Sequence, residues 1–221
     1  MNFSQELIGL ARLGTQTTEY YEVSLNERFQ QAYNTQQQCP LFILDCDFGK
    51  INEHLPEQFD ALLPLLTTVF ENFTQADVGS IIIPNITLHS AIDKLSLAPE
   101  IQAKIIHPLH TGIQFLKSQD IKQITLAGTR HTMQSEQLSS YFEKAGIRVL
   151  RPVAEHIKAL DKIRISVYEA GFSEILLNKM QDILKAYANV VLACTELSVL
   201  NREDNYYDLT KIQIEQAIAR G

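Results

Sequence analysis

The sequence has no tryptophan and few cysteines. Its three cysteines, Cys39, Cys46 and Cys194, are an odd number within 221 residues. None of them forms a C-x-x-C pair, so the sequence predicts neither a disulfide framework nor a zinc site, and we expect no bound metal. Unpaired cysteines are typical of proteins in a reducing compartment, and we therefore expect a cytoplasmic protein.

Positive charge and long apolar runs are also scarce. Lys and Arg number 19 against 26 Asp and Glu, which gives a net charge of −7. Because nucleic acids and anionic membranes bind clustered Lys and Arg, we expect neither as a partner. No apolar run approaches the roughly 20 residues of a membrane helix, and the first residues show no signal-peptide pattern. With 45% hydrophobic and 20% charged residues, the composition is typical of a globular protein.

Several motifs that mark common enzyme classes are missing. The sequence contains neither G-x-x-x-x-G-K-[ST] nor a G-x-G-x-x-G that follows a strand, so it predicts no nucleotide cofactor. It also contains no H-E-x-x-H metal motif and no G-x-S-x-G nucleophile elbow. Any chemistry must therefore use other side chains.

Strand-like and helix-like segments alternate along the chain. Strand patterns lie at 7–11, 41–48, 78–83, 104–107, 123–127, 149–150 and 190–193, and helical patterns lie between them, including 56–73 and 133–145. This alternation predicts an α/β fold with mostly parallel sheets covered on both faces. In such folds the chemistry lies at the carboxyl ends of strands. We therefore examine the loops that follow Ala11, Phe48, Ile83, Ala127 and Ala193.

A weak internal repeat links some of these loops. Residues 10–15 resemble residues 126–129. Asn85 and Cys194 both follow a strand, and the number of residues between them is similar to the number between those two segments. Two similar α/β halves would explain the repeat. Chance matching of short apolar strings is the alternative explanation.

A series of short motifs follows along the chain: Thr18-Glu19-Tyr20-Tyr21, Asp47-Phe48, Gly128-Thr129-Arg130-His131-Thr132-Met133, Cys194-Thr195-Glu196-Leu197, and Asp208 with Thr210. In content and in order these motifs resemble those of the aspartate/glutamate racemase family, specifically its aspartate racemase branch. The resemblance implies two similar parallel-sheet α/β halves related by a pseudo-twofold, with an active-site cleft between them. The first would comprise residues 1–98 and 206–221, and the second residues 99–205.

The resemblance also implies a function. It predicts a racemase or epimerase that acts on an amino acid, aspartate or glutamate, without pyridoxal phosphate or any other cofactor. The expected partners are this small-molecule substrate and a second copy of the chain in a homodimer.

One departure from the family is serious. The family's first catalytic motif is cysteine or threonine, asparagine, threonine, any residue, histidine. Here the segment is Pro84-Asn85-Ile86-Thr87-Leu88-His89. Aligned on Thr87 and His89, Asn85 takes the place of the catalytic thiol, and an inserted residue would put Pro84 there instead. Neither side chain carries a thiol or a hydroxyl.

Racemisation without a cofactor removes the α-proton on one face of the α-carbon and returns it on the other, so it needs two acid/base groups. Cys194 is the expected group on one face. Because it lies between a strand and a helix start, backbone N–H groups are expected to favour its thiolate and to lower its pKa. Asn85 exchanges no proton near neutral pH. It can hold a carboxylate or an enolate-like oxygen, but it cannot be the second base.

Three hypotheses follow from this substitution. The first is that His89, Cys46 or Thr87 supplies the second base, and it is our working hypothesis. The second is one-sided thiol chemistry with Cys194, such as a decarboxylation. The third is that the protein has lost catalysis and binds a ligand or partner.

The remaining expected site residues follow from the loops and from the resemblance. A substrate carboxylate would be held by Ile86, Thr87, Gly128, Thr129, Thr132 and Thr195. Arg130 is expected to bind a distal carboxylate, or to be a solvated loop cation. Asp47 would orient the amine or cap a turn, and Lys162 would lie near the substrate's side chain or on the surface.

Overall fold

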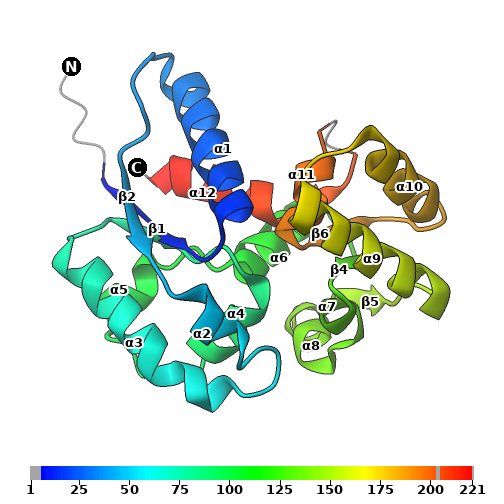
Figure 1. The fold of residues 1–221 in the computed structure, drawn as a ribbon, viewed down its shortest axis with the longest axis horizontal. Coiled ribbons are helices and arrows are strands. Elements are labelled where there is room, and N and C mark those ends of the chain that lie inside the picture. Colours follow the sequence, from blue (N-terminus) through cyan, green and yellow to red (C-terminus); the bar gives the residue numbers. More distant parts are fainter. Residues whose placement is uncertain (1–5, 203–204, 221) are drawn as a thin grey trace. The chain divides into compact units, whose positions relative to one another are not determined.

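A computed structural model describes residues 6–202 and 205–220. The chain forms two compact units, residues 1–107 with 213–221 and residues 108–212 (Figure 1). The family resemblance predicts boundaries at 98/99 and 205/206, whereas the chain passes from one unit to the other at 107/108 and 212/213. The first difference arises because Ile105 forms a parallel bridge with Ile81, and the N–H of Ile106 donates to the Ile81 carbonyl at 2.9 Å. The segment 105–106 therefore extends the first sheet.

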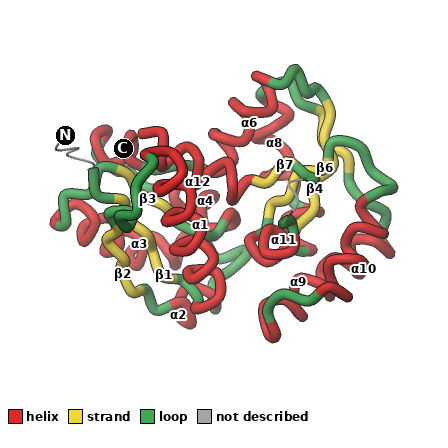
Figure 2. The backbone as a smooth tube through the Cα atoms, turned by 90° about the horizontal axis from the view of Figure 1, so that it is seen from above, coloured by secondary structure: helices red, strands yellow, loops and turns green. Residues whose placement is uncertain are grey.

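The first unit contains a parallel sheet in the order β2-β1-β3. Its strands are β1 (Ile8–Arg12), β2 (Leu41–Asp45) and β3 (Ser80–Ile82), and they lie side by side in Figure 2. Its helices are α1 (Thr15–Tyr33), α2 (Phe48–Asn52), α3 (Phe59–Gln75), α4 (Ile86–Ile92), α5 (Pro99–Lys104) and the greater part of α12 (Leu209–Arg220).

Two apolar cores cover the faces of this sheet. One packs the α3 side chains Leu62, Leu66 and Phe70 against Ala11 and Ile81. The other packs side chains of α1 and α12 against Leu10 and Ile82. Gln213 joins the last helix to this unit. Its Oε1 accepts a hydrogen bond from the Tyr21 hydroxyl at 2.7 Å, and its Nε2 donates one to the Ile106 carbonyl at 2.5 Å.

The second unit contains a parallel sheet in the order β5-β4-β6-β7. Its strands are β4 (Gln123–Gly128), β5 (Arg148–Leu150), β6 (Val190–Ala193) and β7 (Tyr207–Asp208). Its helices are α6 (Pro108–Ser118), α7 (Arg130–Gln134), α8 (Glu136–Lys144), α9 (Ala154–Ala170), α10 (Glu174–Leu184) and α11 (Thr195–Leu200). Helix α9 packs against β4, α7, α10 and α11. No helix in the described part of the chain combines the length and the apolar composition that a membrane span requires.

The predicted fold class is confirmed, with local differences. The single helix predicted over 133–145 is two helices, because Ser135 leaves helical geometry and its Oγ accepts the Leu138 N–H at 3.2 Å as the N-cap of α8. The helix predicted from Pro56 begins at Phe59 instead. The short β7 was not predicted, since its two residues are too few to show a strand pattern.

Both sheets use the same strand order when counted within their own unit. In each, the first strand lies between the second and the third. Asn85 follows the third strand of the first unit and Cys194 follows the third strand of the second. Both are N-caps with extended backbones, φ −153° and ψ 110° for Asn85, φ −163° and ψ 126° for Cys194. The two residues therefore hold equivalent positions in the topology, as the sequence repeat suggested.

Candidate functional site

Cys194 stands at the carboxyl end of β6, directly before α11. Strand β6 is buried along its whole length, and Cys194 itself is 6% exposed. Its side chain belongs to the apolar core of the second unit, together with Ala127, Leu160 and Leu197. The thiol is thus placed at the strand end where chemistry is expected in this fold class, in largely desolvated surroundings.

The Cys194 thiol donates a hydrogen bond to Glu196. The distance from Sγ to Oε2 is 2.7 Å, and Glu196 lies in the first turn of α11. Burial raises the pKa of Cys194 well above its ordinary value, and the Glu196 charge and its hydrogen bond raise it further. The expected lowering of this pKa was wrong, because a backbone N–H at the helix start is outweighed by desolvation and by the carboxylate. The resting thiol therefore carries its proton.

The loop that follows β4 lies next to Cys194. Gly128 is paired in register with Ala193, and a Cβ at position 128 would lie 2.9 Å from the Ala193 carbonyl oxygen. Glycine is needed here so that the two strand ends can approach closely. The chain therefore turns into Thr129 at the strand end neighbouring Cys194.

Threonine hydroxyls line this part of the second unit. Thr129 is the N-cap of α7, where its Oγ1 accepts the Thr132 N–H at 3.0 Å. The Thr129 and Thr132 hydroxyls are hydrogen-bonded at 2.8 Å. Thr195, the first residue of α11, is buried. The structure thus places Gly128 and Thr129 at the end of the strand that pairs with β6, with Thr132 hydrogen-bonded to Thr129.

Asp161 on α9 connects the same loop to two cations. Its Oδ1 accepts the backbone N–H of Arg130 at 3.0 Å and the Arg164 Nε–H at 3.3 Å. The Arg130 side chain is 59% exposed and its Nε lies 4.0 Å from Asp161 Oδ2, so this pair is solvated. Lys162 is exposed on α9.

A buried carboxylate holds the far end of α11. Asp208 Oδ1 accepts the Ser198 hydroxyl at 2.7 Å and the Thr210 N–H at 3.0 Å, and Oδ2 accepts Asn201 Nδ2 at 3.2 Å. Burial raises the pKa of Asp208, although the hydrogen bonds from Ser198 and Asn201 lower it. Because α11 begins at the residue after Cys194, this network fixes the helix that carries Glu196.

In the first unit, Asn85 is the N-cap of α4. Its Oδ1 accepts the Leu88 N–H at 3.0 Å. Ile86 and Thr87, in the first turn of this helix, are half-buried. The Asn85 side chain thus has a structural role in addition to any role toward a ligand.

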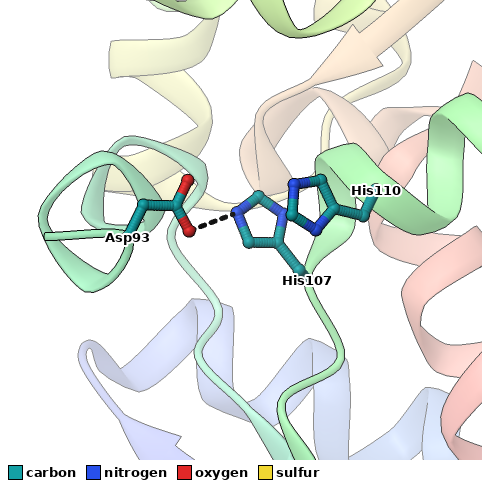
Figure 3. A group of neighbouring side chains, drawn as sticks. All are labelled: Asp93, His107 and His110. Atoms are coloured by element: carbon teal, nitrogen blue, oxygen red, sulfur yellow. Dashed lines mark ion pairs between the residues drawn. The ribbon is translucent and has the colours of Figure 1, made fainter. Parts of the chain in front are cut away.

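His89 is fully buried one turn further along α4. Its Nε2 lies 3.2 Å from the Ile83 carbonyl oxygen. Because a carbonyl only accepts, Nε2 carries the proton. The ring packs against His107 with centroids 4.4 Å apart, and His107 Nε2 lies 3.5 Å from Asp93 Oδ1 (Figure 3). His110, also drawn in Figure 3, belongs to the second unit.

Asp47 and Cys46 follow β2. Asp47 is exposed and caps α2, with its Oδ1 accepting the Lys50 N–H at 3.3 Å, which is the capping alternative of the sequence analysis. This hydrogen bond is the main reason why the pKa of Asp47 is lowered. Burial raises the pKa of Cys46 to about 11, and the Asp45 charge adds to this rise. Cys46 therefore keeps its proton near neutral pH.

Three residues near Cys194 were missed by sequence reasoning. Glu196 lies in a recognised motif to which no role was assigned, and its spacing of two residues from the cysteine at the N-cap position was the available signal. Arg164 is the i+3 neighbour of Asp161 on a helix, a spacing that permits an ion pair. Asp208 was matched to a motif, but only its burial shows what it holds.

Of the known proteins compared with this chain, only solved structures show a similarity to it. No protein-family model and no curated protein matches the chain. A candidate Asp/Glu racemase from Yersinia pestis is 20% identical with a TM-score of 0.80, over 97% of this chain and 98% of that one. An aspartate racemase homologue from Pyrococcus horikoshii OT3 is 18% identical with a TM-score of 0.77, over 97% and 98%. The aspartate racemase of Picrophilus torridus is 13% identical with a TM-score of 0.72, over 93% and 90%.

These identities are low, and the likeness covers nearly the whole of each chain. What it establishes is the fold, two parallel-sheet α/β halves, which is the fold implied by the motifs read from the sequence. The chain therefore has the fold of the structurally characterised Asp/Glu racemase homologues.

Proposed function

We propose that the chain is a member of the aspartate/glutamate racemase family, an isomerase that exchanges the α-proton of an amino acid. The observation that carries this proposal is the Cys194–Glu196 pair at the end of β6, beside the Gly128–Thr129 turn. A buried thiol bonded to a carboxylate, next to threonine hydroxyls and helix starts, is suited to proton transfer beside a bound carboxylate.

The proton steps follow from the resting state of this pair. The thiol gives its proton to the Glu196 carboxylate, and the resulting thiolate takes the α-proton of the substrate. Thr129, Thr132 and Thr195 would hold the substrate carboxylate through their hydroxyls. Reversing the steps returns a proton to the same face, so this pair alone exchanges the α-hydrogen without inversion.

Inversion needs a second group. The position equivalent to Cys194 in the first unit holds Asn85, which caps α4 and transfers no proton near neutral pH. We retain His89, Cys46 and Thr87 as candidates for the second base. One-sided chemistry is the second candidate function, and it is favoured by Asn85, whose side-chain amide does not act as an acid or base near neutral pH.

The proposal includes finer expectations: aspartate or glutamate as the substrate, activity without pyridoxal phosphate, a homodimer and a cytoplasmic location. Arg130 would bind the distal carboxylate of such a substrate through its exposed guanidinium, with Lys162 near the substrate's side chain.

The test is α-hydrogen exchange in D₂O. The purified chain is incubated with L-aspartate or L-glutamate, loss of the α-proton signal is followed by NMR, and the D-isomer is measured by chiral chromatography. We expect exchange that is lost in Cys194→Ala. Cys39→Ser is the matched control, because Cys39 is a buried thiol on the other unit.

Each outcome decides between the hypotheses. Exchange with inversion supports a racemase that has a second base, whereas exchange without inversion supports one-sided chemistry. Equal exchange in Cys194→Ala contradicts the assigned role of the thiol. If the wild-type protein exchanges the α-hydrogen of neither amino acid, the proposed racemase activity on aspartate or glutamate is wrong and the ligand-binding hypothesis remains.

A further inference from the structure

Arg164 is a cationic residue of α9 whose side chain is mostly buried. The Arg164 side chain is 23% exposed, whereas Lys158 on the same helix is exposed. Leu160 and Val167 lie on the helical face of Arg164 at i−4 and i+3, and both belong to the apolar core that contains Cys194. Because α9 packs against α11, which begins directly after Cys194, and against β4, the strand that pairs with β6, this face directs Arg164 toward the part of the second unit that contains Cys194.

Asp161 holds Arg164 in this position. The Arg164 Nε–H donates to Asp161 Oδ1 at 3.3 Å, and among the described residues Asp161 is its only side-chain hydrogen-bond partner. The Asp161 side chain is 15% exposed and also accepts the Arg130 N–H. The carboxylate therefore ties the guanidinium to the loop that lies next to Cys194.

The charged side chains around Cys194 shift the pKa of its thiol in opposite directions. Glu196 on α11 raises the pKa of the thiol, after burial itself, whereas Arg164 on α9 is the side-chain charge that lowers it. When the thiol passes its proton to Glu196, the carboxyl becomes neutral and a negative charge appears on sulfur in a desolvated place. A charge there requires a nearby cation.

We propose that Arg164, oriented by Asp161, is a positioning residue that stabilises the Cys194 thiolate when the proton moves from sulfur to the Glu196 carboxylate. Its catalytic meaning rests on the proposed function, whereas its effect on the thiol does not. The motifs read from the sequence include neither Arg164 nor Asp161.

The experiment measures the thiol itself, without a substrate. Wild-type protein is treated with iodoacetamide over a range of pH values, and alkylation of the Cys194 peptide is measured by mass spectrometry. Iodoacetamide is neutral, so a change in local charge does not alter its approach. In Arg164→Gln we expect the pH profile of Cys194 alkylation to move to higher pH. Below the pKa, the rate falls about tenfold for each pKa unit of this shift.

Three further variants separate charge from structure. Arg164→Lys keeps the charge and should restore most of the wild-type rate. Asp161→Asn leaves the cation but removes its anchor, and it should slow alkylation by a smaller factor than Arg164→Gln. Lys158→Gln removes a positive charge from the exposed side of α9 and should leave the rate unchanged. Circular dichroism establishes that each variant is folded.

A Cys194 profile in Arg164→Gln that matches the wild type overturns the proposal. So does an equal shift in Lys158→Gln, because it would show a general effect of net charge. If Arg164→Gln does not fold, the Asp161→Asn and Arg164→Lys rates decide in its place. The alkylation result stands whether or not the protein exchanges any α-hydrogen, so a failure of the proposed function is recognised separately.

Discussion

Replacing Asn85 by cysteine tests whether the first unit lacks only an acid/base group. The Asn85 side chain accepts the Leu88 N–H at 3.0 Å and so caps α4. Loss of an asparagine N-cap costs about 1 kcal/mol. For a chain of this size, that corresponds to a fall of about 2–4 °C in Tm. Both Asn85→Cys and Asn85→Ala should show this loss, because neither side chain accepts the bond well.

The two variants differ in chemistry. Asn85→Ala should gain no activity, whereas Asn85→Cys places a thiol at the position equivalent to Cys194. A well-placed acid/base group contributes about 10²–10⁴ in rate. We therefore expect Asn85→Cys to increase formation of D-aspartate from L-aspartate by a factor in this range, as measured by chiral chromatography. The alanine variant is the matched control for the lost cap.

Two results would refute this reasoning. If Asn85→Cys forms D-aspartate no faster than Asn85→Ala while both remain folded, the first unit lacks more than a base. If neither variant is less stable than the wild type in thermal unfolding, the Asn85 hydrogen bond does not stabilise α4 as the structure indicates.

Three other predictions follow from the contacts and pKa shifts. Glu196→Gln removes a charge that raises the pKa of Cys194. Iodoacetamide should therefore alkylate Cys194 faster at mildly alkaline pH, while α-hydrogen exchange should slow. Slower alkylation would contradict the assigned contact between Cys194 and Glu196. Asp208→Ala leaves two buried side-chain donors and two backbone N–H groups without their acceptor, and should lower the free energy of unfolding by about 3–5 kcal/mol in urea titrations. Asp120→Asn is the exposed control, and it should leave the free energy of unfolding nearly unchanged. If Asp208→Ala lowers the free energy of unfolding by less than about 1 kcal/mol, the Asp208 carboxylate does not hold the network. Burial raises the pKa of Cys39 from its ordinary value of 9.0 to about 12, so the folded state keeps this proton while the unfolded state loses it, and stability falls as pH rises from 9.0 toward 12. The slope from this thiol is up to about 1.4 kcal/mol per pH unit, and urea unfolding of Cys39→Ser should show a correspondingly flatter alkaline dependence.

Local patterns were sufficient to predict the α/β class. Alternating apolar runs and helical periodicity depend on neighbouring residues only, so β4 and β6 could be placed closely from their sequence. The helix break at Ser135 and the start of α3 at Phe59 were missed, because helical periodicity continues through both segments and only the backbone conformation shows where a helix begins. The boundary at His107 depends on the bridge between Ile81 and Ile105, a pairing between distant residues.

The sequence by itself determined the fold class and the strand ends to examine, including the equivalent positions of Asn85 and Cys194. It did so because strand ends follow from hydrophobic pattern, and because the carboxyl edge of a parallel sheet collects them. Only the tertiary structure decided the chemistry around the thiol. The pKa of Cys194 depends on burial, on the orientation of Glu196 and on Arg164 from another helix. Desolvation and charge separation are properties of packing, and residues distant in sequence create them only when the chain is folded.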